Sequence, residues 1–181
     1  QTAAVICLGG VGLAAVLGAV CAGASRIVAI DLADDKLQLA KSLGATDCFN
    51  AASESIVDEV KAATRGGVDF AMEFAGSVKA MELAYKITRR GGTTISAGLP
   101  PPTHMLQIPH VNMVAEERTI KGSYVGSCVP SRDIPRFIAM YRGGSLPVNR
   151  LLSERITLDE INPALDRLAR GESIRQVVMM G

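Results

Sequence analysis

The glycine-rich turn at residues 7–12, with the sequence CLGGVG, has the residue types that hold the pyrophosphate of a dinucleotide. That chemistry needs glycine where the backbone turns sharply, where it approaches the phosphates, and where a helix packs closely on a strand. Gly9 and Gly12 take the second and third places, while Cys7 stands in the first, where glycine is usual. A helix beginning near Gly10 adds unpaired N–H groups and a partial positive charge. The turn therefore predicts a phosphate site, slightly altered in shape at Cys7.

An acidic residue that suits the ribose of such a dinucleotide lies 19 positions after Gly12, at Asp31. Its carboxylate can accept hydrogen bonds from both ribose hydroxyls of the adenosine, and its charge repels the 2′-phosphate of NADP. Residues 32–34 bring no arginine to offset that charge, so the sequence predicts NAD over NADP. Lys36 can reach the same ribose. Two plainer alternatives remain open: Asp31 caps a turn, and Lys36 is a solvated helical lysine.

Strand and helix patterns alternate around this turn, which is typical of a parallel α/β sheet. Strands are predicted at residues 3–8, 26–31, 45–49, 68–73, 93–97 and 118–124. Helices are predicted at 11–22, 34–43, 54–64 and 77–89, with a helical turn at 111–115. Six strands complete two mononucleotide-binding halves. We therefore predict a Rossmann-type, doubly wound, six-stranded parallel sheet over residues 1–149.

Residues 150–181 form an appendage of one helix and one strand in this interpretation. Thr157 and Glu160 match a capping box before a helical apolar pattern, and a strand is predicted at 174–180. Pro163 is expected to kink that helix or to restart it with Asn162 as the cap. The appendage should also carry a bare hydrophobic face, for which the candidates are Leu151, Leu152, Ile156 and Val177.

The overall composition favours an ordinary globular domain and disfavours a partner of strong charge. The chain has 181 residues and a formal net charge of +1, which removes the electrostatic case for binding nucleic acid or an anionic membrane. Its four cysteines include no CxxC pair, which argues against a disulfide framework or a zinc knuckle and favours the reducing cytoplasm. His104 and His110 are six positions apart with no neighbouring cysteine, so no metal set can be assembled.

The first 25 residues carry no charge and are long enough to span a bilayer, so a membrane helix is an alternative for this segment. Five glycines within it weaken a helix, and division into a buried strand, a turn and a helix explains the pattern better. The chain also opens on Gln1 rather than methionine, from which we expect a fragment of a longer protein.

The sequence resembles the coenzyme domain of the zinc-type alcohol dehydrogenases, in the medium-chain dehydrogenase/reductase superfamily. The resemblance covers essentially the whole chain. It rests on LGGVGLA at 8–14, GASRIVAID at 23–31, LGATDC at 43–48, GGVDFAMEFAG at 66–76, KGSYVGS at 121–127 and GESIRQVV at 171–178. Cys7 departs from the family pattern, because alcohol dehydrogenases usually have glycine there. Quinone-reductase-like members accept a small residue at this place, so coenzyme binding is expected to be retained.

The resemblance implies a role in NAD binding for each residue that matches a family motif. The glycine turn and Arg175 contact the pyrophosphate, Asp31 and Lys36 bind the adenosine ribose, and Leu32 lines the adenine slot. On the other side, Val11 packs behind the nicotinamide ring, and backbone groups near the ends of later strands hold its carboxamide. The full implied set is Leu8, Gly9, Gly10, Val11, Gly12, Asp31, Leu32, Lys36, Phe74, Ala75, Gly76, Ala97, Leu99, Ser123, Val125 and Arg175.

The family also implies an activity for the longer protein, namely hydride transfer from a primary or secondary alcohol to NAD. In the family both zinc ions and most of the substrate are bound by an N-terminal domain that would precede Gln1, and residues 150–181 would return to that domain. The chain alone is therefore expected to lack turnover, catalytic residues and a metal site. The resemblance further implies a homodimer through the strand at 118–124. The alternatives are an NAD-responsive binding module, a zinc-independent quinone-reductase-like member, and a membrane-anchored protein.

Overall fold

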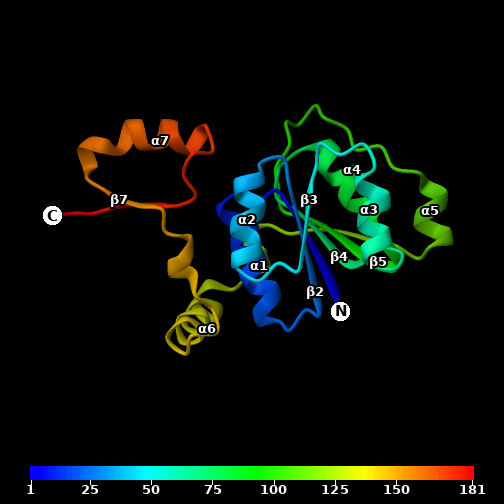
Figure 1. The fold of residues 1–181 in the computed structure, drawn as a ribbon, viewed down its shortest axis with the longest axis horizontal. Helices are drawn as coiled ribbons and strands as arrows, with labels where there is room; N and C mark the ends of the chain where they lie inside the picture. The colour runs from blue at the N-terminus through cyan, green and yellow to red at the C-terminus, as the bar shows by residue number, and fades with distance from the viewer.

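The centre of the structure is a parallel sheet of six strands in the order β3-β2-β1-β4-β5-β6 (Figure 1). The computed structural model describes all residues from Gln1 to Gly181. The strands are β1 Thr2–Ile6, β2 Arg26–Asp31, β3 Asp47–Asn50, β4 Val68–Glu73, β5 Thr88–Ser96 and β6 Thr119–Gly122. The strand order reverses direction between β1 and β4, so the predicted doubly wound sheet is confirmed.

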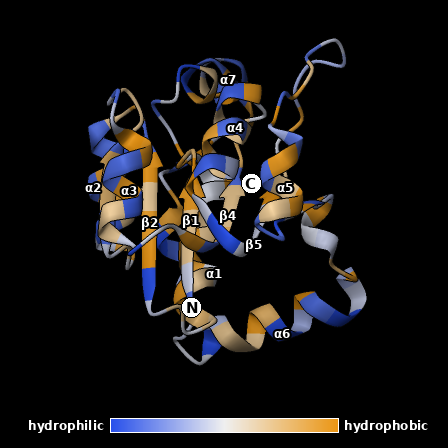
Figure 2. Ribbon diagram, turned by 90° about the vertical axis from the view of Figure 1, so that its right-hand side faces the viewer, coloured by the Kyte–Doolittle hydropathy of each residue, from blue (hydrophilic) through white to orange (hydrophobic).

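Helices cover the two faces of this sheet. They are α1 Gly10–Cys21, α2 Asp34–Ser42, α3 Ile56–Ala63 and α4 Val78–Ile87. α1 and α2 pack on one face, where Val5 and Leu37 belong to a single core cluster. α3 and α4 pack on the other face, where Ile6 and Val60 belong to a second cluster. Figure 2 shows the hydrophobic residues of β1 and β2 in the interior between these layers.

The central strand β1 is apolar from Ala3 to Ile6 because helices cover both faces of the sheet. Val5 and Ile6 are successive residues of β1, and each is almost wholly buried in a different cluster. The uncharged segment at the start of the chain thus divides into β1 and α1, as the strand, turn and helix interpretation predicts. Among the helices of the structure, none has the length and hydropathy needed to cross a membrane.

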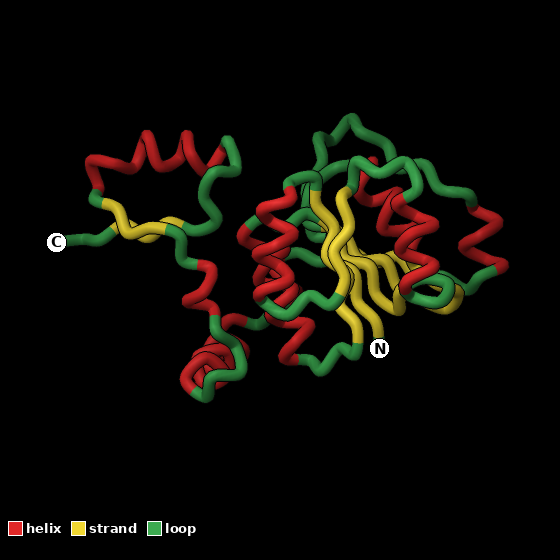
Figure 3. Tube along the Cα trace, in the orientation of Figure 1, coloured by secondary structure: helices red, strands yellow, loops and turns green.

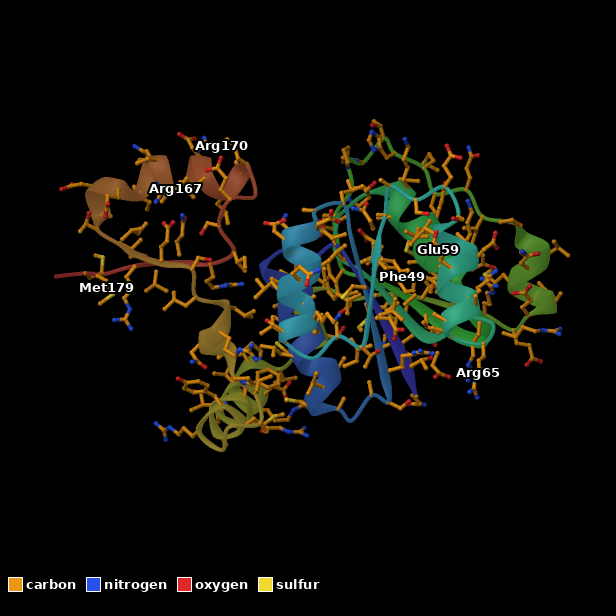
Figure 4. All side chains as sticks on the ribbon, in the orientation of Figure 1. Phe49, Glu59, Arg65, Arg167, Arg170 and Met179 are labelled. Carbon is orange, nitrogen blue, oxygen red and sulfur yellow. The ribbon has the colours of Figure 1, made fainter.

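A smaller C-terminal unit follows β6, apart from the main sheet in Figures 1 and 3. Its two short strands, β7 Glu154–Ile156 and β8 Gln176–Val178, pair in parallel, and α7 Ile161–Ala169 connects them. Arg167 lies on α7 and Arg170 directly follows it (Figure 4), and they pair with Glu154 and Glu172 at 2.8 and 2.6 Å. The remaining elements are α5 His110–Ala115, α6 Pro130–Arg142, and the 3-10 turns Val125–Ser127, Val148–Leu151 and Leu158–Glu160.

Several expectations about these outer elements are wrong. No element is predicted over residues 130–142, where the structure forms α6. β5 begins at Thr88, within the predicted helix, and pairs with Val68 before a register shift. The capping box of Thr157 and Glu160 is present, but α7 already begins at Ile161. Asn162 is therefore not its cap, and Pro163 lies in the first turn, where its missing N–H is not needed.

The predicted bare face of the appendage also needs correction. Leu151 and Ile156 are each only 5% exposed, because Leu151 packs into the core cluster beside α1 and Ile156 packs within the C-terminal unit. Val177 is exposed, as expected. Other exposed apolar side chains of the appendage include Leu158 before α7, Leu165 and Leu168 on α7, and Met179 and Met180 after β8.

Candidate functional site

The glycine turn joins the end of β1 to the first turn of α1, at the carboxyl edge of the sheet. A Cβ built on Gly12 would lie 1.8 Å from the carbonyl oxygen of Cys7, so only glycine lets α1 start this close to the turn. A Cβ on Gly9 would meet no atom within 4 Å. The turn therefore leaves an open stretch of backbone beside a helix N-terminus, which suits a phosphate group.

Cys7 has a left-handed backbone conformation, with φ of +73°. Its N–H donates a hydrogen bond to the carbonyl oxygen of Ile30 at 2.9 Å, which ties the turn to β2. A residue with a Cβ is disfavoured in this conformation by about 1–2 kcal/mol. The first place of the glycine pattern thus keeps a backbone conformation that glycine adopts freely, and the cysteine side chain strains it.

Asp31 lies at the last position of β2, and it is 9% exposed. Its Oδ2 accepts a hydrogen bond from the N–H of Leu8 at 2.6 Å, and its Oδ1 accepts one from the N–H of Ala33 at 3.0 Å. The capping alternative therefore describes part of its role, since the carboxylate holds both the glycine turn and the turn after β2. A carboxylate offers about four acceptor positions, so acceptor capacity for ribose hydroxyls remains.

The residues around Asp31 extend the site along the same edge. Leu32 is 71% exposed directly after β2, where the adenine slot is expected. Lys36 is half-buried, and its Nζ lies 3.3 Å from the position of a Cβ on Gly171. The ammonium group therefore lies against the loop between α7 and β8 rather than in open solvent.

Arg175 reaches the glycine turn from the C-terminal unit. A Cβ on Gly10 would lie 3.1 Å from Arg175 Nη2, so the guanidinium group lies beside the start of α1. A pocket of about 380 Å³ opens there, lined by Gly10, Val11, Arg175 and apolar residues of the C-terminal unit. The guanidinium and the helix N-terminus are both positive toward this pocket, which favours an anionic group.

The loops after β4, β5 and β6 meet along the other half of the carboxyl edge. The N–H of Phe74 donates to Ile6 O at 3.1 Å, and the N–H of Ser123 donates to Ser96 O at 2.9 Å. Ala97 donates its N–H to Glu73 O at 3.0 Å. The structure thus brings together Phe74, Ala75 and Gly76 with Ala97 and Ser123, and the exposed residues Leu99 and Val125 follow on the same loops.

One residue of this edge was not predicted from the sequence. Glu73 ends β4 and is only 1% exposed, yet it carries a carboxylate beneath the loops just described. The only sequence signal was an acid at the last place of a buried strand. His104 and His110 are exposed, and no three His, Cys, Asp or Glu side chains in the structure are grouped so that they could hold a metal ion.

The chain is similar over nearly all of its length to known dehydrogenases. The family described as zinc-binding dehydrogenase matches residues 10–142. The chain is 35% identical to alcohol dehydrogenase class-P of Arabidopsis thaliana and 38% identical to alcohol dehydrogenase class-2 isozyme 2 of Oryctolagus cuniculus. The alignments cover 100% and 99% of this chain and 48% of each relative. The chain therefore spans about half the length of the curated relatives it matches.

Solved structures show the same likeness. The chain superposes over 100% of its length on benzyl alcohol dehydrogenase from Acinetobacter calcoaceticus, with a TM-score of 0.95 and 30% identity, and covers 49% of that chain. An alcohol dehydrogenase zinc-binding domain protein from Burkholderia ambifaria gives the same TM-score at 29% identity, with 48% of its chain covered. The fold expected from the resemblance is therefore found in solved members of the family.

Proposed function

This chain belongs to the zinc-binding dehydrogenase family, and from that premise we propose that residues 1–149, together with Arg175, bind NAD in a protein that transfers hydride from a primary or secondary alcohol to NAD. The observation that carries the proposal is the convergence of the glycine turn, Asp31 and Arg175 at one edge of the sheet. These groups come from distant parts of the sequence, and together they match a pyrophosphate linked to a ribose.

The adenosine and pyrophosphate half of NAD fits the observed residues. The open backbone at Gly9, the N-terminus of α1 and the guanidinium group of Arg175 supply positive polarity for two phosphates. Asp31 accepts hydrogen bonds from the ribose, and Lys36 donates to the same sugar. The negative charge of Asp31 favours NAD over NADP.

The nicotinamide half occupies the loops after β4, β5 and β6. Val11 is 60% exposed at the start of α1 and packs behind the ring, while backbone groups at Ala97, Ser123 and Val125 orient the carboxamide. When bound, NAD supplies the hydride acceptor. Because these residues offer no zinc ligand set, we assign no step to zinc and no catalytic residue to this chain. We expect the isolated chain to bind coenzyme without turnover.

Titration of the isolated chain with NADH and with adenosine tests this proposal. Arg175→Ala should weaken NADH binding by roughly tenfold, since a charge-assisted contact to the pyrophosphate is lost. Adenosine has no phosphate, and its affinity should not change. Arg170→Ala is a matched control, because Arg170 is exposed and pairs with Glu172 away from the turn. The proposal fails if the unmodified chain binds neither NADH nor adenosine at millimolar concentration.

We also propose that two chains associate through the outer edge of β6. Ser123 donates its N–H to β5, and alternate residues of a strand face the same neighbour, so the N–H of Ile120 faces outward. Thr119–Gly122 is otherwise an exposed edge, which is a site for strand pairing. Pairing of two such edges would give a homodimer with a sheet continuous across both subunits.

Two broader proposals concern the whole protein. Residues 150–181 belong with the part of the relatives that this chain does not span, and the exposed side chains of Leu165 and Leu168 support this because apolar groups on an outer helix favour a partner surface. A fluorescent dye for apolar surfaces should therefore bind the chain. All four cysteines are unpaired, which is compatible with the reducing cytoplasm.

A further inference from the structure

A buried carboxylate connects the loops at the nicotinamide half of the site. Oε1 of Glu73 accepts a hydrogen bond from the N–H of Gly76 at 2.7 Å and a longer one from the N–H of Ser77 at 3.4 Å. Oε2 accepts a hydrogen bond from the hydroxyl of Ser96 at 2.9 Å. One side chain therefore holds the loop after β4 and the end of β5 at the same time.

The two loops touch through backbone atoms directly above this carboxylate. A Cβ on Gly98 would lie 2.1 Å from the Gly76 nitrogen and 3.0 Å from Glu73 Oε2. A Cβ on Gly76, whose φ is +64°, would lie 2.8 Å from the carbonyl oxygen of Leu99. Neither glycine leaves space for a side chain, so a shift of one loop must displace the other.

The carboxylate also fixes the orientation of these loops. Glu73 takes part in none of the ion pairs of the structure, so neutral donors alone compensate its buried charge. A carboxylate only accepts hydrogen bonds, and therefore the N–H of Gly76 must point toward it. In a planar trans peptide, the carbonyl of Ala75 then points away from Glu73.

We propose that Glu73 is a positioning residue for the nicotinamide end of the coenzyme, acting through the loops at 74–77 and 97–99. This inference rests on the proposed function, because those loops are the ones assigned to nicotinamide. The adenosine end depends on Asp31 and the glycine turn, which make no hydrogen bond to the Glu73 side chain. Loss of the carboxylate should therefore weaken the hold on nicotinamide and leave the adenosine end unchanged.

The test compares two ligands on the isolated chain, with NADH followed by its fluorescence and AMP by calorimetry. Glu73→Ala should weaken NADH by roughly tenfold or more, because hydrogen bonds to a charged group are lost and the partly buried N–H of Gly76 is left unpaired. The affinity for AMP should stay within about twofold, as additivity predicts for separate sites. Glu73→Gln should rescue NADH binding, since its oxygen can accept from Gly76 and its amide can donate to the Ser96 hydroxyl.

Thr94→Val is the matched control for a buried polar residue on the same strand as Ser96. The Thr94 hydroxyl is fully buried and pairs with that of Thr88 at 2.8 Å, so its loss affects stability but not the loops. If Glu73→Ala does not fold, Ser96→Ala removes the β5 donor to Glu73, together with a longer contact of 3.5 Å to the Gly98 carbonyl oxygen, and should also weaken NADH selectively. Equal weakening of NADH and AMP, or no weakening of NADH, overturns the inference. If the unmodified chain binds neither ligand, the proposed function itself fails.

Discussion

Replacement of Asp31 by asparagine is the sharpest test of coenzyme choice, and the structure shows that it changes two things. The carboxylate now accepts backbone hydrogen bonds from Leu8 at 2.6 Å and from Ala33 at 3.0 Å, one on each oxygen. Asparagine keeps one oxygen, and its NH₂ group must face the other N–H as donor against donor. The variant therefore disturbs the glycine turn as well as removing the negative charge.

The two effects differ in how they act on NAD and NADP. Disturbance of the glycine turn should weaken both coenzymes by the same factor because they share the pyrophosphate, and the lost hydrogen bond of about 1.5–3 kcal/mol sets an upper limit of roughly 150-fold on that factor. At an effective dielectric constant of about 20 and a separation of about 5 Å, two unit charges repel by about 3 kcal/mol. Removal of this repulsion helps NADP alone. The NAD to NADP affinity ratio should therefore fall by roughly a hundredfold.

Calorimetric titration of the chain and its Asp31→Asn variant with NADH and NADPH separates these effects. Asp35→Asn is the control, because it removes the same charge from an exposed position of α2. A loss of affinity that NADH and NADPH share reports the disturbance of the glycine turn. The ratio of the two affinities reports the charge beside the ribose. If the melting temperature falls while the ratio stays within about threefold of the unmodified chain, Asp31 is only a cap and the reasoning is refuted.

Three further predictions concern strain, assembly and acid stability. Cys7→Gly should raise the melting temperature by about 1–3 °C in calorimetry, because glycine relieves the strain of a positive φ; a fall would show that thiol packing dominates. Ile120→Pro removes an outward N–H from β6 and should leave monomers in light scattering, whereas dimers at the same concentration would contradict the edge pairing. Hydrogen bonds from Thr2, aided by Arg89, hold the pKa of Asp69 below its ordinary value. Its stabilisation is therefore present above about pH 4 and is lost as the pH falls through that lowered pKa, so denaturant unfolding of Asp69→Asn should show a weaker dependence on acid.

The parts of the fold that were predicted correctly are those in which local pattern and burial agree. The strands at 26–31 and 68–73 match β2 and β4 residue for residue, because in each a charged residue near the start is followed by apolar residues and a terminal acid at the carboxyl edge. The helix α6 was missed, although Ile134, Phe137, Ile138 and Tyr141 follow a helical spacing. Pro130 and Pro135 obscured that pattern, and none of its residues is buried.

The site was predictable where its residues are close in sequence or follow a fixed spacing. The glycine turn and Asp31 follow from such a pattern, but the contact of Arg175 with the start of α1 depends on how the C-terminal unit packs. The bonding of Glu73 was not predictable from local sequence, because only Gly76 follows it in the next loop, whereas Ser96 lies at the end of β5, distant in the sequence. Only the register of β4 with β5, which pairs Glu73 with Ser96, brings them together.

Two buried carboxylates at the carboxyl edge, Asp31 and Glu73, accept hydrogen bonds in the same way, but they differ in exposure and therefore in role. Asp31 and Glu73 each accept an N–H from the turn that follows their own strand and a second donor from a neighbouring segment. Asp31 remains 9% exposed, so its unused acceptor positions can meet a ligand, whereas Glu73 is 1% exposed beneath two loops that touch each other. Loss of charge at Asp31 should therefore alter which coenzyme is bound. At Glu73 the hydrogen bonds matter more than the charge. Glu73→Gln should therefore preserve NADH binding, whereas Asp31→Asn should not preserve the preference for NAD.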